Sequence, residues 1–445
     1  MTIIFIMTHQ EPSPDITRVS FRARLARLVV ANRAFVVVWL ALFIAIIGIS
    51  MVSPLMPVFA EKMGASGIWL GLAFSGFALS QIPLMPVIGR LSDRYGKKRF
   101  LWMGLLIYTA AALGYFWAPG YHELVLFRIL SGVGASMVIP IAFSYVGELA
   151  PKDYEGRYMG LFTIAMIAGF GIGPVLGGVI HDNISMDATF ISMAIFSILG
   201  FLVIFFFLPA TSTAPGAPSS VEGARPEEPA TSFLSMLKDS TIQGVIALQL
   251  TFGLLFGTVL AFIGVWMTTT IDTSVAQVGI LLSARSIMNG ALSYPFGWLA
   301  DNMNRVILVS VGMGMVAVGT FTIPWLGNFG ILLAVFVVIG IFESMAMPSL
   351  NAITVEKGRI LGMGTVMGMF NMAMSLGLVT GSMVGGVIET SMGIDAVFRF
   401  AAVLGLVGIV AFNAFMFRST RLSRNNPAIT QPDTPDPKTH ESTDS

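Results

Sequence analysis

The sequence predicts an all-α membrane protein with twelve transmembrane helices, arranged as two six-helix bundles. Three observations predict this fold class. Of the 445 residues, 55% are hydrophobic and only 11% are charged, whereas soluble proteins carry about 25% charged residues. Twelve apolar stretches are each long enough to cross a bilayer. The second six stretches repeat the first six at a constant offset, which is 208 residues between Gly160 and Gly368.

The apolar stretches fall into two sets, which we expect to form bundles over residues 34–208 and 241–417. The first set lies at about 35–60, 68–91, 100–118, 122–149, 155–180 and 188–208. The second set lies at about 241–268, 276–300, 305–326, 328–355, 359–388 and 394–417. Element boundaries that are read from a sequence are accurate to about four residues.

Three polar segments flank and join the two bundles. Residues 1–33 form a basic N-terminal arm, in which the Arg-rich segment 17–29 suits either a helix lying on an anionic membrane surface or a plain basic arm. Residues 209–240 are rich in Pro, Ala, Ser and Glu and predict a flexible linker. Residues 418–445 predict a polar, disordered tail.

The distribution of positive charge predicts the orientation in the membrane. With twelve spans, 21 of the 25 Lys and Arg residues fall on the side of the N-terminus, and Lys62 alone lies in a loop on the other side. Loops rich in Lys and Arg stay in the cytoplasm. We therefore expect a multi-pass protein of the cell inner (plasma) membrane, with both termini and the linker in the cytoplasm.

A glycine-rich stretch in the fifth span shows the repeat most clearly. Gly169, Gly173 and Gly177 lie on one helix face, and a face without Cβ atoms allows another helix to approach closely. The copy in the eleventh span keeps the glycines and replaces Pro174 by Ser382. Two halves with six spans each have the same orientation, and such parallel repeats enclose a cavity that opens to either side as the halves rock.

Composition also excludes several kinds of site. The chain has no cysteine and four scattered histidines, so we expect no metal site and no thiol chemistry. A net charge of +1 argues against nucleic-acid binding. No G-x-x-x-x-G-K-[ST] motif for ATP is present. We expect a protein that is not an enzyme and has no cofactor. We expect it to function as a monomer in the lipid bilayer, with a small-molecule substrate and protons as the species that it binds.

The turn after the second span reads GRLSDRYGKKR. It resembles the cytoplasmic signature of the major facilitator superfamily, G-x-L-x-D-R-x-G-x-[RK]-[RK]. The resemblance implies the major facilitator fold and a latch that holds the cytoplasmic side shut, in which Asp93 would meet the start of a helix of the other half. The alternative is that these cations only set the topology. The latch positions are Gly89, Asp93, Arg94, Gly96 and Arg99.

The fifth span carries a second signature, G-x8-G-x3-G-P-x2-G-G. It resembles the antiporter motif of the twelve-helix drug:proton antiporters, and this resemblance implies export rather than uptake. The alternative is tight helix packing in any transporter. The motif residues are Gly160, Gly169, Gly173, Pro174, Gly177 and Gly178.

Charged residues inside spans are costly and are candidates for function. Arg128 in the fourth span matches the family's R-x-x-x-G-x-G signature, which implies a cation that modulates a nearby acid, although it could also reach the interface. Glu343 lies near the middle of the tenth span, where burial favours the protonated form, so it could couple transport to protons or bind substrate. A structural hydrogen bond is the alternative. Either Arg128 or Arg285 could be its partner.

These features predict a secondary active transporter that exports apolar or cationic small molecules in exchange for protons. The alternatives are an exporter of one metabolite or lipid on the same fold, and a membrane receptor that transports nothing. Few neutral polar side chains are available to line the cavity: Gln81, Tyr145, Gln249, Asn289, Tyr294, Asn351 and Asn371.

Overall fold

The computed structural model describes residues 33–150, 155–209, 236, 238–361 and 363–425. Within these residues it has twelve helices that are long and apolar enough to cross a membrane, which confirms the predicted number. No β-strand occurs in this part of the chain. The basic segment 17–29, most of the linker and the tail from residue 426 lie outside the described residues, so what we expect of them stays a prediction.

The N-terminal bundle contains six spans, of which the first is interrupted. Pro54 and Pro57 lack backbone N–H donors and lie at the starts of the two segments that follow the break. The elements are α2 (Arg33–Val52), η1 (Ser53–Leu55), α3 (Met56–Lys62), α4 (Ile68–Tyr95), α5 (Lys97–Trp117), α6 (Tyr121–Leu149), α7 (Glu155–Asn183) and α8 (Met186–Phe207).

The C-terminal bundle contains the other six spans. Its elements are α10 (Ser240–Thr270), α11 (Val275–Asn302), α12 (Arg305–Thr322), η2 (Ile323–Trp325), α13 (Phe329–Leu361), α14 (Met363–Met392) and α15 (Ile394–Asn425). Helices α13 and α15 end at Leu361 and Asn425, later than residues 355 and 417, where the sequence predicts that the tenth and twelfth spans end. The reason is that hydropathy marks where a helix leaves the apolar layer, whereas its backbone hydrogen bonds continue into the polar segment.

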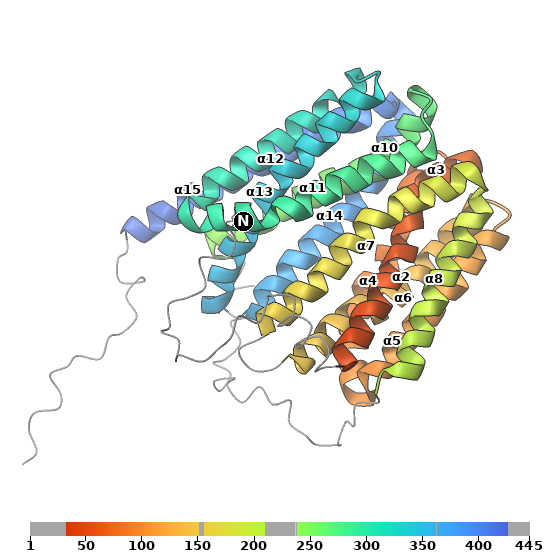
Figure 1. Ribbon diagram of the computed structural model, residues 1–445. Helices are drawn as coiled ribbons and strands as arrows, with labels where there is room; N and C mark the ends of the chain where they lie inside the picture. The colour runs from red at the N-terminus through yellow and green to blue at the C-terminus, as the bar shows by residue number, and fades with distance from the viewer. Residues whose placement is uncertain (1–32, 151–154, 210–235, 237, 362, 426–445) are drawn as a thin grey trace, which may run out of the picture.

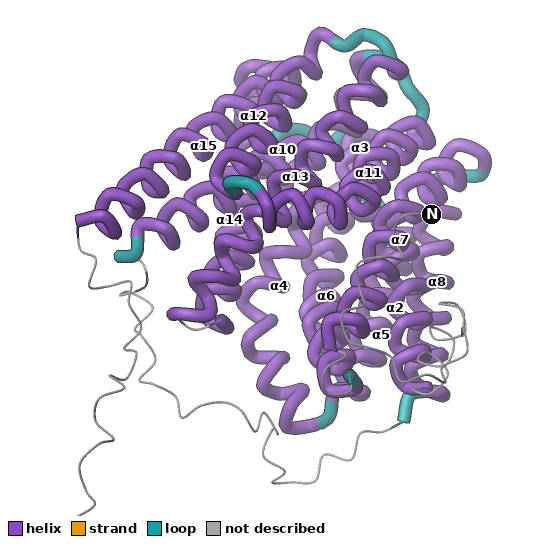
Figure 2. Tube along the Cα trace, turned by 60° about the vertical axis from the view of Figure 1, so that its left-hand side comes forward, coloured by secondary structure: helices purple, strands orange, loops and turns teal. Residues whose placement is uncertain are grey.

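The two bundles lie side by side in Figure 1, with the red-to-green helices α2 to α8 in one group and the green-to-blue helices α10 to α15 in the other. The helices run the full depth of the molecule and are joined mostly by short loops (Figure 2). We call the end that carries the turn between α4 and α5 the motif end. We call the opposite end, where α4 and α11 begin, the closed end.

Glycines bring the two bundles together along two seams at the closed end. In the α7–α11 seam, a Cβ atom added to Gly279 would lie 2.2 Å from the carbonyl oxygen of Pro174. In the α4–α14 seam, a Cβ atom added to Gly71 would lie 2.2 Å from the carbonyl oxygen of Ser382. Gly71 and Gly279 are equivalent in the repeat, as are Pro174 and Ser382. The sequence repeat is therefore a repeat of backbone contacts.

Other glycines pack α7 and α14 inside their own bundles. A Cβ atom at Gly177 of α7 would lie 2.2 Å from the carbonyl oxygen of Met51 in α2. One at Gly381 of α14 would lie 2.2 Å from the carbonyl oxygen of Leu254 in α10. Real Cβ atoms do not approach backbone oxygens this closely, so these positions accept no larger residue without separation of the helices.

These contacts predict that Gly177→Ala destabilises the folded protein by about 1–3 kcal/mol, because the new methyl group must displace backbone atoms. Gly160→Ala in the same helix is the matched control, since nothing lies within 4 Å of a Cβ atom there. Both substitutions replace Gly by Ala within α7 and so gain the same helix propensity. The difference between their unfolding temperatures therefore reports the contact of Gly177 with α2. Thermal unfolding in detergent measures it; equal unfolding temperatures would contradict the packing argument.

Candidate functional site

A buried ion pair lies inside the C-terminal bundle. An Nη2 atom of Arg285 on α11 lies 2.8 Å from Oε2 of Glu343 on α13, and each side chain is about 10% exposed. The guanidinium also lies over the ring of Phe256 on α10, 4.8 Å from its centroid. The pair thus joins three helices. It also answers the question that the sequence left open, because the structure pairs Glu343 with Arg285 and not with Arg128.

Close packing of α11 and α13 makes this pair possible. Gly340 of α13 lies one turn before Glu343, and a Cβ atom there would lie 2.6 Å from the carbonyl oxygen of Arg285. The two helices therefore cross with almost no side chain between them at this level. Loss of either partner would leave an uncompensated buried charge, which is strongly destabilising.

Arg128 is fully enclosed in the N-terminal bundle, where it is 2% exposed. Its guanidinium donates to the carbonyl oxygen of Phe74 in α4, at 3.1 Å from Nη2 and 3.3 Å from Nε, and to the hydroxyl of Ser53. It also lies 4.9 Å from the ring centroid of Phe77. Within the described residues it forms no ion pair with an acid. Its contacts hold α6 against α4 and the break in the first span.

The two seams differ in one hydroxyl group. In the α4–α14 seam, the hydroxyl of Ser382 donates to that of Ser75 at 2.7 Å. Ser283 is the equivalent of Ser75, and the equivalent of Ser382 is Pro174, which has no hydroxyl. Ser283 is 3% exposed, and its hydroxyl has no hydrogen-bond partner. Pro174 therefore removes from the α7–α11 seam a bond that the other seam keeps.

The bundles separate toward the motif end. One face of α11 contacts α7 through Gly279, Ile287 and Gly290. The next two positions on that face, Tyr294 and Trp298, are 79% and 62% exposed. Figure 2 shows α4 and α14 running apart toward the lower part of the view. The structure therefore has its bundles in contact at the closed end and apart at the motif end.

Comparison with known proteins identifies the family. The family model described as the Major Facilitator Superfamily matches residues 38–270 and 245–441, which include nearly all of both bundles. The chain belongs to the Major Facilitator Superfamily. The resemblance seen in the signatures is thereby confirmed, together with the fold class.

Individual relatives agree with this assignment. An uncharacterized MFS-type transporter of Methanocaldococcus jannaschii is 25% identical over 378 residues, 84% of this chain and 96% of the relative. The quinolone resistance protein NorA of Staphylococcus aureus is 28% identical over 187 residues, which are 42% of this chain and 48% of NorA. The chain thus aligns with about half the length of NorA.

Solved structures show the same fold. A bacterial homolog to the human lysosomal transporter Spinster, in an inward-facing and unoccupied conformation, superposes with a TM-score of 0.72 at 14% identity, covering 88% of this chain and 97% of that one. The human organic anion transporter MFSD10 superposes with a TM-score of 0.59 at 17% identity, covering 85% and 99%. At these identities the likeness concerns the fold alone.

The superfamily signature between α4 and α5 is placed at the motif end, where the bundles are apart. Its Asp93 side chain is 69% exposed and lies 3.6 Å from Lys97, four residues later. Gly96 has φ of +95° and ends α4, which allows the sharp turn into α5. Arg94 lies over the ring of Tyr95. A latch role for Gly89, Asp93, Arg94, Gly96 and Arg99 therefore stays a prediction from the resemblance.

Two charge clusters at the motif end escaped the sequence analysis. Lys97 is buried and pairs with Glu148 at the end of α6 and, more distantly, with Asp93. The equivalent Arg305 pairs with Glu356 at 2.9 Å and with Asp301 at 3.8 Å. The 208-residue repeat predicts them, because each of the three residues of the first cluster has a residue of like charge in the second cluster, 208 positions later. This second cluster lines a surface pocket of about 680 Å³.

The antiporter motif is divided between two neighbours. Gly169, Gly173 and Gly177 pack against α2, whereas Pro174 and Gly178 pack against α11 of the other bundle. Gly160 meets nothing within 4 Å of a Cβ position. The motif thus builds the α7–α11 seam and fixes α7 to its own bundle at the same time.

The expected cavity-lining residues do not share one environment. Tyr145 and Gln249 are buried, at 1% and 4% exposure, and the Gln249 side-chain oxygen has no partner. Gln81 and Asn289 are half-buried, and Asn351 and Asn371 are exposed. Asn371 donates to the Met367 carbonyl oxygen in its own helix. A lining role stays a prediction for each of them.

The buried pair makes a prediction about stability. Glu343→Gln or Arg285→Gln alone leaves one uncompensated charge and should lower the free energy of unfolding by about 3–5 kcal/mol. The double variant Arg285→Gln/Glu343→Gln should recover most of that loss. Thermal unfolding in detergent measures the cycle, with Arg305→Gln in the exposed pair with Glu356 as the control, expected to cost below about 1 kcal/mol. Additive losses would show that the two residues do not interact.

Proposed function

We propose that the chain is a secondary active exporter that moves apolar or cationic small molecules out of the cell in exchange for protons. The observation that carries this proposal is the buried carboxylate Glu343 and its partner Arg285. An acid held inside a span is costly, and a proton-coupled transporter needs such a group. The partial similarity to NorA, a quinolone resistance protein, supports drug export.

The orientation that we propose places the motif end in the cytoplasm. That end carries the cations Arg90, Arg94, Lys97, Lys98 and Arg99, and such loops remain inside. The closed end then faces the exterior. In this orientation the structure represents the form that is open to the cytoplasm, which is the form that an exporter uses to take up its substrate.

The proposed coupling uses the ion pair as a proton-dependent contact. In the form described here, Glu343 is paired with Arg285 at 2.8 Å. When the closed end opens, a proton from the exterior binds Glu343 and converts the ion pair into a weaker, neutral contact. Return to the form that is open to the cytoplasm re-forms the ion pair with Arg285 and releases the proton. The proton and the substrate thus move in opposite directions.

A second candidate concerns the charge of the substrate. Away from the helix ends, the buried charged groups Arg128, Arg285 and Glu343 sum to one positive charge. Arg128 has no acidic partner among the described residues. A buried cation without a counter-ion favours an anionic ligand nearby. Export of an organic anion is therefore the second candidate, and efflux assays with dyes of either charge distinguish the two.

The coupling proposal predicts that Glu343→Gln abolishes proton-driven efflux of an apolar dye from energised membrane vesicles, because glutamine cannot bind a proton in this range. Glu356→Gln at the motif end is the control and should transport normally. The double variant Arg285→Gln/Glu343→Gln restores the charge balance and should still fail to couple. Unchanged proton-driven transport in Glu343→Gln would refute the role.

The latch proposed for the superfamily signature makes a separate prediction. Asp93→Asn should shift the population further toward forms that are open to the cytoplasm, since the carboxylate would otherwise meet a helix start of the other bundle when the motif end closes. The chain has no cysteine, so Tyr294→Cys can report exposure of the motif end to a maleimide. Equal labelling with and without Asp93→Asn would count against the latch.

A further inference from the structure

Two carboxylates at the closed end reach across the seams to helix starts of the opposite bundle. Asp182, in the last turn of α7, accepts hydrogen bonds from the backbone N–H groups of Val275 and Ala276, with oxygen–nitrogen distances of 3.3 and 2.7 Å. Glu389, near the end of α14, accepts one from the N–H of Gly67 at 2.8 Å. These amides open α11 and α4, the two helices that the seams join to α7 and α14.

The two contacts are related by the repeat. Gly67 and Val275 are equivalent positions, 208 residues apart. A Cβ atom at Gly178 would lie 2.5 Å from the carbonyl oxygen of Val275, and one at Gly386 would lie 2.4 Å from that of Gly67. The glycines therefore bring each carboxylate within reach of the other bundle. The acids themselves are one position out of register, since the equivalent of Asp182 is Thr390.

The amides that these acids bind have no partner within their own helices. The first N–H groups of a helix are unsatisfied, and its N-terminus carries partial positive charge, so a carboxylate there is favourable. Ser274 caps α11 through the N–H of Gln277, which leaves the amides of Val275 and Ala276 to Asp182. Gly67 begins α4 without a side-chain cap of its own. Each helix start thus completes its capping with an acid from the other bundle.

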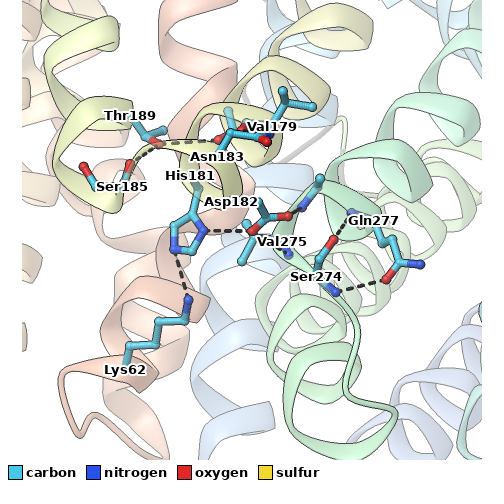
Figure 3. Close-up of polar contacts among 12 residues, drawn as sticks. Lys62, Val179, His181, Asp182, Asn183, Ser185, Thr189, Ser274, Val275 and Gln277 are labelled. Atoms are coloured by element: carbon cyan, nitrogen blue, oxygen red, sulfur yellow. Dashed lines mark hydrogen bonds and ion pairs between the residues drawn. The ribbon is translucent and has the colours of Figure 1, made fainter.

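Asp182 is further fixed from its own side, as Figure 3 shows. Nζ of Lys62 lies 3.0 Å from Nε2 of His181, and Nδ1 of His181 lies 3.0 Å from Oδ1 of Asp182. An ammonium group only donates, so Nε2 accepts and the proton on Nδ1 points to Asp182. The His181 ring also stacks on Phe59, 5.5 Å between centroids. The carboxylate is therefore held in position to meet α11.

We propose that Asp182 and Glu389 are paired latch residues that hold the closed end of the transporter shut, each by capping the first turn of a helix of the other bundle. The inference rests on the proposed alternating access, because the closed end must open for release. Opening breaks the three hydrogen bonds that these two carboxylates accept from helix starts of the other bundle. The two acids thereby set how readily the transporter leaves the form described here.

Cysteine reporters on one face of α11 test the proposal in the full chain. Ser283→Cys lies in the closed seam at a position that is 3% exposed, and Tyr294→Cys lies beyond the seam at a position that is 79% exposed. The latch variant is Asp182→Asn/Glu389→Gln, which keeps the shapes and removes the charges. Glu123→Gln is the control, because Glu123 lies in the first turn of α6 at the same end without a described contact to the other bundle.

A neutral amide in place of a carboxylate weakens each latch contact, which should shift the equilibrium several-fold at each position and about tenfold for both together. The latch variant should therefore raise the labelling rate of Ser283→Cys by a membrane-impermeant maleimide about tenfold, and should lower that of Tyr294→Cys. Glu123→Gln should change neither rate. A rise at both reporters means general loosening and overturns the proposal, as does an unchanged rate at Ser283→Cys.

The labelling is measured without a gradient or a substrate, so its outcome is separate from transport. Suppose that the latch variant raises labelling at Ser283→Cys and lowers it at Tyr294→Cys, but the unmodified chain exports no dye. This result would support the latch and refute proton-driven export. Proton-driven dye export by the unmodified chain, with unchanged labelling in the latch variant, would support export and refute the latch. Should the double variant fail to elute as a single species in detergent, Asp182→Asn and Glu389→Gln are labelled singly, each with an expected shift of several-fold in the same direction.

Discussion

The absence of Cβ atoms at a few glycines is the constraint on which the rest of the structure depends. At the closed end the backbones of the two bundles come so close that any side chain at Gly71, Gly178, Gly279 or Gly386 would meet a carbonyl group or backbone carbon. Lipid supplies no hydrophobic force between helices, so close backbone contact and short polar bonds must hold the bundles together. Both seams, and the hydrogen bonds that Asp182 and Glu389 accept, exist only at this separation.

The buried charges break the symmetry that the glycines keep. Arg128 in the N-terminal bundle corresponds to Phe336, and Arg285 in the C-terminal bundle corresponds to Phe77. Inside the described spans, each half therefore carries its buried arginine on a different helix of the equivalent pair, and the buried acid Glu343 lies in the C-terminal half. Arg128 is held by a carbonyl oxygen, a hydroxyl and a ring, whereas Arg285 is held by Glu343 and a ring. The N-terminal contacts thus involve no acid, whereas the C-terminal pair contains one.

Much of the fold could be predicted from the sequence, and the reason is physical. Hydrophobic length and the 208-residue repeat each report a constraint that acts locally along the chain, so twelve spans in two like halves followed directly. The partner of Glu343 could not be predicted, because Arg128 and Arg285 both lie inside spans and only the crossing of α11 and α13 at Gly340 brings Arg285 to the acid. The contacts of Asp182 and Glu389 were missed because the two acids are one residue out of register.

The difference between Pro174 and Ser382 gives the two seams different energetics. The α4–α14 seam has a hydroxyl pair between Ser75 and Ser382, in a place where hydrogen bonds are not weakened by water. The α7–α11 seam has a buried, unpaired hydroxyl at Ser283, which costs about 1–3 kcal/mol relative to a satisfied one. It also has the carboxylate with two amide partners rather than one. The polar contacts of the α7–α11 seam are therefore concentrated at its end, where Asp182 lies, and are missing in its interior, where Ser283 lies. Loss of the Asp182 contacts therefore removes a larger share of the polar contacts from the α7–α11 seam, which the antiporter-like motif builds, than loss of the Glu389 contact removes from the α4–α14 seam.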